Sequence, residues 1–271
     1  MTDFVFIDSG VGGIPYMTAL LKRAPVTSCV YVADAANFPY GEKTHQQVVE
    51  CVVELVRKIC KRFDPRVIVV ACNTMSVNAL ETLRETFPDV KFIGTVPAIK
   101  LAASVSKKHR IGLLATKATC ENPYNLELKE KFASDCTLIN RPDPELISYI
   151  EHNAFTASRE ECLKAVKPAV DFFRSKDCDV MILGCTHFLN FTDVFEEACA
   201  PDITAVDSVD GVVRHAIEVS GLEGECATNN QSQNSQVHPS LYTTGFGDSQ
   251  EKAQYDSLCS KLGLNFAGLL Q

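Results

Sequence analysis

The sequence predicts an α/β fold made of two similar domains with mainly parallel sheets. Short apolar runs alternate along the chain with longer segments of helical periodicity, and this alternation is typical of parallel sheets covered by helices. Several of the short runs are apolar at every position, as expected for strands buried on both faces. The chain has 271 residues, which at about 150 residues per domain corresponds to two domains or one large one.

Nine short runs are predicted to be strands, because each is apolar and is followed by polar or turn-forming residues. They are residues 4–8, 28–34, 66–72, 91–95, 110–116, 136–140, 179–185, 202–206 and 241–244.

Helices are predicted where apolar residues recur every three or four positions. Residues 44–63 show this pattern most clearly, with Lys and Glu between the apolar positions. The other predicted helices are 77–87, 98–107, 158–174, 208–219 and 249–262. Residues 221–240 interrupt the alternation with the polar stretch ATNNQSQNSQ, which we expect to be a mobile surface insertion.

The composition excludes several classes of function. The chain carries 26 Lys and Arg against 34 Asp and Glu, with no long run of one sign, which argues against binding to nucleic acid or to a membrane surface. Apolar runs such as residues 67–72 are too short to span a bilayer. The start, MTDFVFIDSG, enters a strand pattern at once and lacks a basic or cleavable segment. We therefore expect a cytoplasmic location.

The twelve cysteines do not form a recognisable metal or redox motif. The two nearest in sequence are seven residues apart, whereas zinc ribbons, thioredoxin-type pairs and iron–sulfur runs need closer spacing. His45, His109, His152, His215 and His238 also lack ligand spacing. We expect no metal site, these histidines to be ordinary surface or core residues, and most thiols to be reduced and buried.

The first strand ends in a candidate binding loop. Asp8 and Ser9 lead into a turn with glycines at positions 10, 12 and 13 that opens onto a helix. Such a turn can expose backbone N–H groups near a positive helix end and suits an anionic ligand. Nucleotide binding is disfavoured, because Pro15 stands where a dinucleotide fingerprint has its third glycine and no Gly-Lys-Ser/Thr follows.

Two cysteines stand apart from the other ten. Cys72 and Cys185 each close a predicted strand and precede a predicted helix, within the similar segments VVACNT and ILGCTH. A helix N-terminus favours the thiolate form of a cysteine. Polar residues follow both thiols, and His187 could either exchange a proton with Cys185 or cap the helix. The matched contexts indicate that both cysteines are functional.

Six motifs in this order resemble the glutamate racemase family. They are FIDSGVGG, FPYGEK, ACNTMS, GTVPAIK, LLATKATCENPY and GCTHF, and LYTTG near the end resembles the family's C-terminal portion. The resemblance implies a cofactor-independent enzyme that supplies D-glutamate for peptidoglycan. It also implies two similar α/β domains, residues 1–94 with 207–271 and residues 95–206, with the active site in the cleft between them.

By motif position, the resemblance makes Cys72 and Cys185 the acid/base residues, with Asp8 and His187 beside them as proton-handling partners. It assigns the binding of substrate to Ser9, Pro39, Tyr40, Gly41, Asn73, Thr74, Thr116, Thr119 and Thr186. The implied partner is a small molecule, glutamate, with no cofactor or metal, and a homodimer is compatible with it.

The pairing of two thiols suits this reaction. Racemisation removes the proton from Cα and returns one to the opposite face, and two bases on opposite sides are the simplest arrangement. Three alternatives stay open at this point. A racemase acting on aspartate or a hydantoin would keep both cysteines, a thiol-dependent hydrolase would use one with His187, and a non-catalytic anion-binding protein would need neither.

Overall fold

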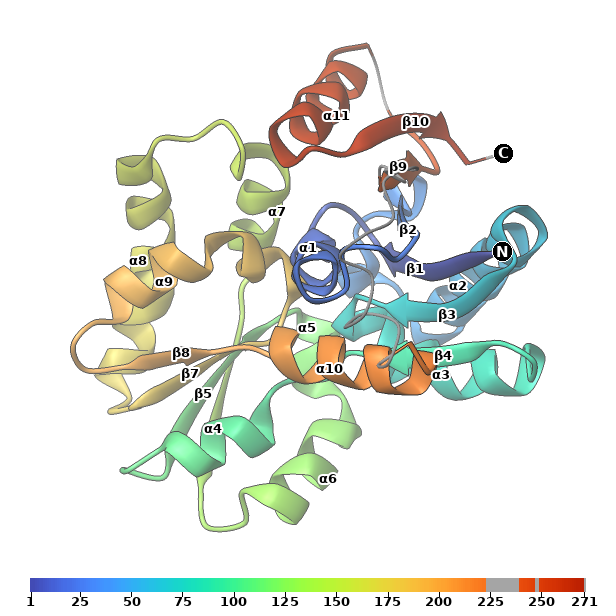
Figure 1. Ribbon diagram of the computed structural model, residues 1–271. Helices are drawn as coiled ribbons and strands as arrows, with labels where there is room; N and C mark the ends of the chain where they lie inside the picture. Colours follow the sequence, from blue (N-terminus) through green and yellow to red (C-terminus); the bar gives the residue numbers. More distant parts are fainter. Residues whose placement is uncertain (223–238, 247–248, 271) are drawn as a thin grey trace. The chain divides into compact units, whose positions relative to one another are not determined.

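The computed structural model describes residues 1–222, 239–246 and 249–270 (Figure 1). The chain divides into two compact units, Met1–Thr95 with Val209–Gln271 and Val96–Ser208. Each unit contains one sheet, and every strand pair in both sheets is parallel. The predicted α/β fold with parallel sheets is therefore confirmed. Among the described residues, no helix is long and apolar enough to cross a membrane.

The first unit has a six-stranded sheet in the order β10-β9-β2-β1-β3-β4. Its strands are β1 (Thr2–Asp8), β2 (Cys29–Ala33), β3 (Pro65–Val70), β4 (Lys91–Gly94), β9 (Ser240–Thr243) and β10 (Asn265–Leu269). Ile7 of the central strand β1 is in register with Val32 of β2 and Val70 of β3. The three strands thus end at the same edge of the sheet.

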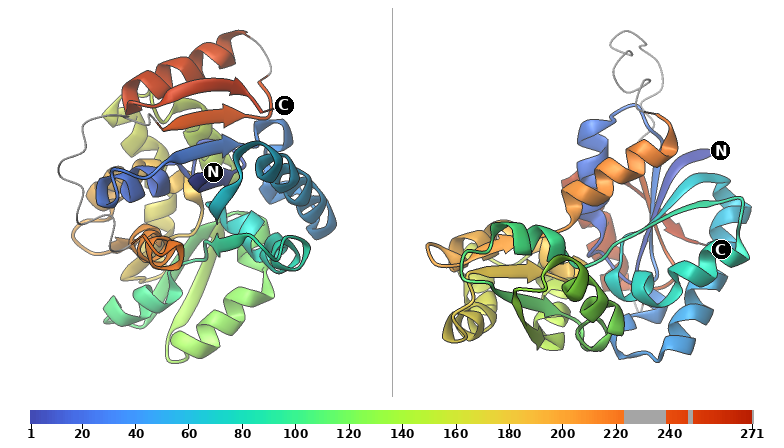
Figure 2. Two further views of the ribbon diagram at one scale, coloured as in Figure 1. Left: turned by 45° about the vertical axis from the view of Figure 1, so that its right-hand side comes forward. Right: turned by 90° about the horizontal axis from the view of Figure 1, so that it is seen from below.

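Helices cover both faces of this sheet, as the edge-on view in Figure 2 shows. Its helices are α1 (Ile14–Arg23), α2 (His45–Phe63), α3 (Asn73–Thr86), α10 (Val209–Ser220) and α11 (Ser249–Leu262). Helices α1 and α10 contact each other on one face, and α2 and α3 pack together on the other. The apolar stripe of α2 explains its position, because Val52, Val56 and Ile59 are fully buried in one core with Ile7 and Val70.

The second unit has a four-stranded sheet in the order β6-β5-β7-β8. Its strands are β5 (Arg110–Ala115), β6 (Thr137–Pro142), β7 (Val180–Leu183) and β8 (Thr204–Val206). Its α-helices are α4 (Ile99–Val105), α5 (Lys117–Glu121), α6 (Pro123–Phe132), α7 (Pro144–Asn153), α8 (Arg159–Ser175) and α9 (Thr192–Cys199). Leu114 of β5 is in register with Leu183 of β7, so these two strands also end together.

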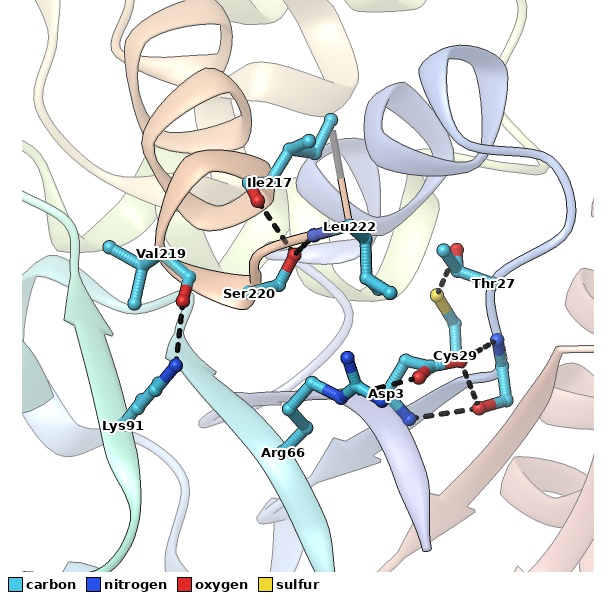
Figure 3. A network of polar contacts seen from close by, with 10 residues as sticks. Asp3, Thr27, Cys29, Arg66, Lys91, Ile217, Val219, Ser220 and Leu222 are labelled. Carbon is cyan, nitrogen blue, oxygen red and sulfur yellow. Dashed lines mark hydrogen bonds and ion pairs between the residues drawn. The ribbon is translucent and has the colours of Figure 1, made fainter. Parts of the chain in front are cut away.

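The amino edge of the first sheet is tied together by polar side chains (Figure 3). The Asp3 carboxylate at the start of β1 accepts hydrogen bonds from the Ser28 backbone N–H at 2.9 Å and from its hydroxyl at 2.7 Å. Arg66 Nε of β3 lies 3.7 Å from the same carboxylate. Lys91 Nζ of β4 donates to the carbonyl of Val219 in α10 at 2.9 Å. These contacts fix the edge opposite the strand ends that carry the candidate site residues.

The predicted boundaries differ from the structure in a few informative places. Strands β3 and β7 end at Val70 and Leu183, so both candidate cysteines lie just beyond their strands. Helix α3 starts at Asn73 rather than at residue 77. The helix expected after Cys185 begins as a 3-10 helix, η3 (Thr186–Phe191), and α9 follows it from Thr192.

Several elements were not predicted. Helices α6 and α7 begin with proline after the capping residues Asn122 and Asp143, and these Asn-Pro and Asp-Pro pairs are equally typical of turns. Helices α5 and α9 and strand β10 are short. Of the predicted polar insertion at 221–240, residues 223–238 lie outside the described residues.

Candidate active site

In the first unit, Asp8 is the buried centre of the loop that follows β1. Its Oδ1 accepts hydrogen bonds from the backbone N–H of Gly10 at 3.0 Å and from the Ser9 hydroxyl at 3.1 Å. A Cβ on Gly13 would lie 2.7 Å from the carbonyl oxygen of Ala71 and 3.0 Å from Asp8 Oδ2. The glycine therefore allows the turn to close over the carboxylate, against the end of β3.

The glycine-rich turn was expected to bind an anion through its backbone N–H groups, but two of these groups are used within the protein. The N–H of Gly10 is taken by Asp8, and the N–H of Gly13 donates to the Tyr31 hydroxyl at 3.0 Å. The same hydroxyl donates to the carbonyl of Gly10 at 2.8 Å. Two of the backbone donors expected to face a ligand thus serve the protein itself. Tyr31 fixes the turn, and sequence reasoning had placed it only within a strand.

Cys72 lies beside this turn along the sheet edge. The Ala71 backbone N–H donates to the carbonyl of Ile7 at 2.8 Å, which aligns the end of β3 with the end of β1. Cys72 is the N-terminal capping residue of α3, and Asn73 and Thr74 occupy the first turn of that helix. All three are buried. The N-terminus of this 14-residue helix favours the thiolate of Cys72.

The junction between β3 and α3 is fixed by Ser76. Its hydroxyl donates to the carbonyl of Val70 at 3.0 Å and accepts a hydrogen bond from the Thr95 backbone N–H at 2.9 Å. Val70 ends β3, and Thr95 directly follows β4. The position of Cys72 therefore depends on both of these strands.

Asp34 organises the loop that follows β2. Its backbone N–H donates to the carbonyl of Asp8 at 2.7 Å. Its buried carboxylate accepts hydrogen bonds from Asn37 Nδ2 at 3.0 Å, from Thr244 Oγ1 at 2.6 Å and from the Tyr40 hydroxyl. Sequence reasoning noted Asp34 only as a strand end, and nothing in its local sequence signals these contacts.

Three predicted substrate contacts, Pro39, Tyr40 and Gly41, lie in that loop. The peptide bond before Pro39 is cis, and Tyr40 and Gly41 belong to a 3-10 helix, η2 (Tyr40–Glu42). The Tyr40 ring is buried and its hydroxyl is directed to Asp34. Burial and then the Asp34 charge raise the pKa of Tyr40 above its ordinary value. The Tyr40 hydroxyl therefore donates its proton to the Asp34 carboxylate and supports the loop.

In the second unit, Thr116 and Thr119 meet at the end of β5. Thr116 caps α5, because its hydroxyl oxygen accepts from the Thr119 backbone N–H at 3.1 Å and its O–H donates to Thr119 Oγ1 at 2.9 Å. The Gly184 backbone N–H donates to the carbonyl of Leu114 at 2.7 Å. This contact sets the residues after β7, Cys185 and Thr186, next to the end of β5.

Cys185, His187 and Glu151 form a chain of three side chains. His187 Nδ1 lies 3.5 Å from Cys185 Sγ, and Nε2 on the other side of the ring lies 2.7 Å from Glu151 Oε2. The thiol and the imidazole are buried, and the Glu151 side chain is 12% exposed. Burial lowers the pKa of His187, but the charges and hydrogen bonds of Cys185 and Glu151 outweigh it and raise this pKa well above its usual value. The histidine therefore holds a proton next to the thiol.

Glu151 was missed by sequence reasoning. It lies on α7, one turn after Ile147 and next to Ile150, both of which are buried. A carboxylate on the apolar face of a helix is a recognisable signal, but α7 itself was not predicted.

Each unit therefore brings one cysteine together with its own partners. The first gathers Asp8, Ser9, Cys72, Asn73 and Thr74 at the ends of β1 and β3. The second gathers Thr116, Thr119, Cys185, Thr186 and His187 at the ends of β5 and β7.

Other histidines lie apart from these two groups. His45 contacts Asn78, His152 contacts the carbonyl of Ser148, and His215 contacts Glu218, all at exposed positions. His238 lies outside the described residues.

Comparisons with known proteins agree on one family. The model of the Asp/Glu/Hydantoin racemase family matches residues 15–216. The glutamate racemase of Treponema pallidum strain Nichols is 37% identical over 268 residues, which cover 99% of this chain and 96% of that protein. The glutamate racemase of Shewanella sp. strain ANA-3 is 34% identical over 241 residues, or 88% of this chain and 85% of that protein.

Solved structures show the same likeness. Escherichia coli glutamate racemase, in complex with L-glutamate and the activator UDP-MurNAc-ala, superposes with a TM-score of 0.83 at 29% identity and covers 99% of this chain and 97% of that one. The Francisella tularensis enzyme with D-glutamate shares the fold, with a TM-score of 0.75 at 20% identity over 99% of this chain and 96% of that one.

Proposed function

The chain belongs to the Asp/Glu/hydantoin racemase family, and on that premise we propose that it interconverts L-glutamate and D-glutamate with two cysteine thiols as acid and base. The full-length similarity to glutamate racemases supports glutamate over other substrates of the family. The single observation that carries the mechanism is that each unit holds one buried cysteine two residues after a parallel strand, one at the N-terminus of α3 and the other 3.5 Å from His187 Nδ1.

In the proposed reaction, one thiolate removes the proton from Cα while the other cysteine, as a thiol, donates a proton to the opposite face. A C–H bond breaks and an S–H bond forms on one side, and the reverse occurs on the other. Cys72 deprotonates D-glutamate and Cys185 deprotonates L-glutamate. The mechanism requires both units to present their thiols to one substrate molecule.

The two thiols are supported in different ways. Cys72 lies at the N-terminus of α3 beside the turn that buries Asp8. Cys185 precedes a short 3-10 helix, so we assign its support to the protonated His187, which is in turn held by Glu151. A positive imidazole near the sulfur stabilises the thiolate and can return the proton.

The substrate carboxylates and ammonium group would be held by polar side chains and by backbone groups of the loop after β2. The proposed side chains are Ser9, Asn73, Thr74, Thr116, Thr119 and Thr186, with Pro39, Tyr40 and Gly41 shaping the loop. Fixed dipoles of this kind stabilise the negative charge that builds up on the substrate as Cα loses its proton. The proposed mechanism uses no cofactor, and chelators are expected to leave turnover unchanged.

The proposed cellular role is the supply of D-glutamate for peptidoglycan in the cytoplasm. None of the eleven cysteines in the described part of the chain takes part in a disulfide, and a reducing compartment would keep their thiols reduced. A homodimer stays a prediction, which sedimentation at several protein concentrations can test.

A substrate panel tests the proposed activity. Circular dichroism should show loss of optical activity when purified protein is added to L- or D-glutamate, in buffer without pyridoxal phosphate. Aspartate and 5-substituted hydantoins should be racemised at least about 100-fold less efficiently, because a pocket built for one polar side chain discriminates strongly. Faster racemisation of aspartate or a hydantoin would identify that compound, and not glutamate, as the preferred substrate. No racemisation of any compound in the panel would refute the proposal.

A further inference from the structure

A second group of reactive side chains lies at the opposite edge of the second sheet from Cys185. His109 directly precedes β5, and Asp135 and Cys136 directly precede β6. These strands are paired at their first residues, Arg110 and Thr137, so the three side chains meet at the amino edge of the sheet. Within residues 1–222, 239–246 and 249–270, this is the one group of three or more Cys, His, Asp or Glu side chains arranged to hold a metal ion.

One ligand atom from each of the three side chains lies within 4.8 Å of the other two, close to the spacing around a tetrahedral metal ion. His109 Nδ1 lies 2.9 Å from Asp135 Oδ2 and 3.7 Å from Cys136 Sγ, and Cys136 Sγ lies 3.6 Å from Asp135 Oδ1. Nitrogen, oxygen and sulfur ligands at the usual zinc distances and tetrahedral angles are about 3.3 to 3.6 Å apart. A small rotation of the exposed Asp135 and His109 side chains would complete the geometry.

The backbone holds His109 in place for this role. Its φ is 56°, in the left-handed region, where His, Asn and Asp are enriched among residues other than glycine. The loop before it is fixed by Asp179, whose carboxylate accepts from the Ser106 hydroxyl at 2.6 Å and from the backbone N–H groups of Lys107 and Lys108 at 2.6 and 2.9 Å. The carbonyl of His109 accepts from the Thr137 backbone N–H at 2.7 Å. These hydrogen bonds hold the loop of residues 106–109 in place, with the His109 imidazole near Cys136.

The charges also suit a divalent cation. A thiolate and a carboxylate supply two negative charges, and the imidazole binds as a neutral ligand. Lys129 and Asp179 are the other charged groups near the sulfur, and their charges oppose each other. Magnesium and calcium prefer all-oxygen sites, whereas a set of sulfur, nitrogen and oxygen is typical of zinc and cobalt.

We propose that His109, Asp135 and Cys136 form a surface site for a zinc-class divalent cation, with water as the fourth ligand, that ties the start of β5 to the start of β6. The sequence alone predicted no metal site, because the spacing of 26 to 27 residues from His109 to the other two ligands matches no ligand motif. Strand pairing brings them together. The site is independent of the proposed racemisation.

The test is a titration of the metal-free protein with Co²⁺ as a spectroscopic probe for zinc. Wild type should bind one equivalent with a thiolate-to-cobalt charge-transfer band in the near ultraviolet, and Zn²⁺ should displace it. His109→Asn and Cys136→Ser should each weaken binding at least about tenfold, since even outer-shell changes cost 10- to 100-fold. Asparagine tolerates the left-handed backbone, so His109→Asn should fold and racemise glutamate normally.

His215→Asn is the matched control. His215 is similarly exposed and lies 3.4 Å from Glu218, but among the residues that the structure describes it forms no group with a cysteine, so its removal should leave Co²⁺ binding unchanged. The proposal is overturned if wild type shows no charge-transfer band at stoichiometric Co²⁺. It is also overturned if His109→Asn weakens binding less than tenfold, which would place the bound cobalt on other thiols such as Cys185.

Discussion

Glu151 Oε2 lies 2.7 Å from His187 Nε2, on the side of the imidazole ring opposite Cys185. Burial alone would lower the pKa of His187, but the charges and hydrogen bonds of Cys185 and Glu151 hold this pKa well above its usual value. Glu151 touches no reacting atom in the proposed mechanism and is a positioning residue. In that mechanism Glu151 favours the protonated imidazole, which would return its proton to the neighbouring Cys185.

The first prediction concerns the two thiols. Cys72→Ser and Cys185→Ser should each lower kcat for racemisation by about 10²- to 10⁴-fold, the usual contribution of a positioned acid or base, because a hydroxyl is a much weaker base than a thiolate. Cys60→Ser and Cys162→Ser, at positions on α2 and α8, should leave kcat within about twofold. Near wild-type turnover by either of the first two variants would contradict the two-thiol mechanism.

The second prediction is a pH shift caused by Glu151. In the direction from D- to L-glutamate, Cys185 must donate a proton that His187 can supply, so kcat should fall as the pH rises through the raised pKa of His187. Glu151→Gln removes a charge that raises the pKa of His187. The alkaline limb of kcat should therefore move to lower pH.

Glu145→Gln is the control for that shift, because Glu145 lies exposed at the start of the same helix. Its pH profile should match wild type. An unchanged profile in Glu151→Gln would show that the carboxylate does not act through the histidine.

The third prediction separates the role of Asp8 from substrate binding. Asp8→Asn keeps an oxygen to accept from Gly10 and Ser9 but loses the charge. In the proposed mechanism this charge assists proton transfer at Cys72, so its loss should lower kcat about 10- to 100-fold, equivalent to about 1.4 to 2.7 kcal/mol in the barrier, with little change in KM. His187→Asn should behave in the same way.

Asp3→Asn provides the comparison for Asp8, since Asp3 lies at the other end of the same strand and contacts Ser28 and Arg66. It should lower stability slightly and leave kcat intact. An increase in KM alone for Asp8→Asn would assign that carboxylate to substrate binding.

The fourth prediction asks whether the Tyr40 hydroxyl serves the fold or the substrate. Tyr40→Phe removes a buried hydrogen bond to the Asp34 carboxylate, which should lower the free energy of unfolding by about 1.5 to 3 kcal/mol. Urea denaturation measures this loss, and Tyr124→Phe, at an exposed position, should show none. A large increase in KM without loss of stability would instead mean that the hydroxyl binds glutamate directly.

The sequence predicted the α/β fold because its strands are local apolar runs and its longer helices carry their own periodicity. Cys72 and Cys185 were singled out for a similar reason, since both follow a strand within a short segment that can be recognised without tertiary structure. Asp8 and His187 can be recognised from sequence for the same reason, because each lies at or near the end of a predicted strand.

The supporting residues could not be found in this way. Glu151 reaches His187 across 36 positions of sequence, and Thr244 reaches Asp34 across 210. Both contacts exist only after helices and strands have packed. Likewise, Phe188 and Phe191 of the 3-10 helix Thr186–Phe191 are buried, and tertiary packing of this kind overrides local helix propensity.

The fate of the Cα hydrogen in deuterium oxide tests the central claim most directly. If one thiol abstracts the proton and the other delivers a solvent-exchanged one, product of the opposite configuration should carry deuterium at Cα from its first appearance. Substrate recovered at the same early time should carry much less. Chiral separation with mass spectrometry measures both. Equal early labelling of substrate and product would indicate a single base serving both faces, and no labelling would mean that the Cα–H bond is never broken, which would contradict racemisation by this protein.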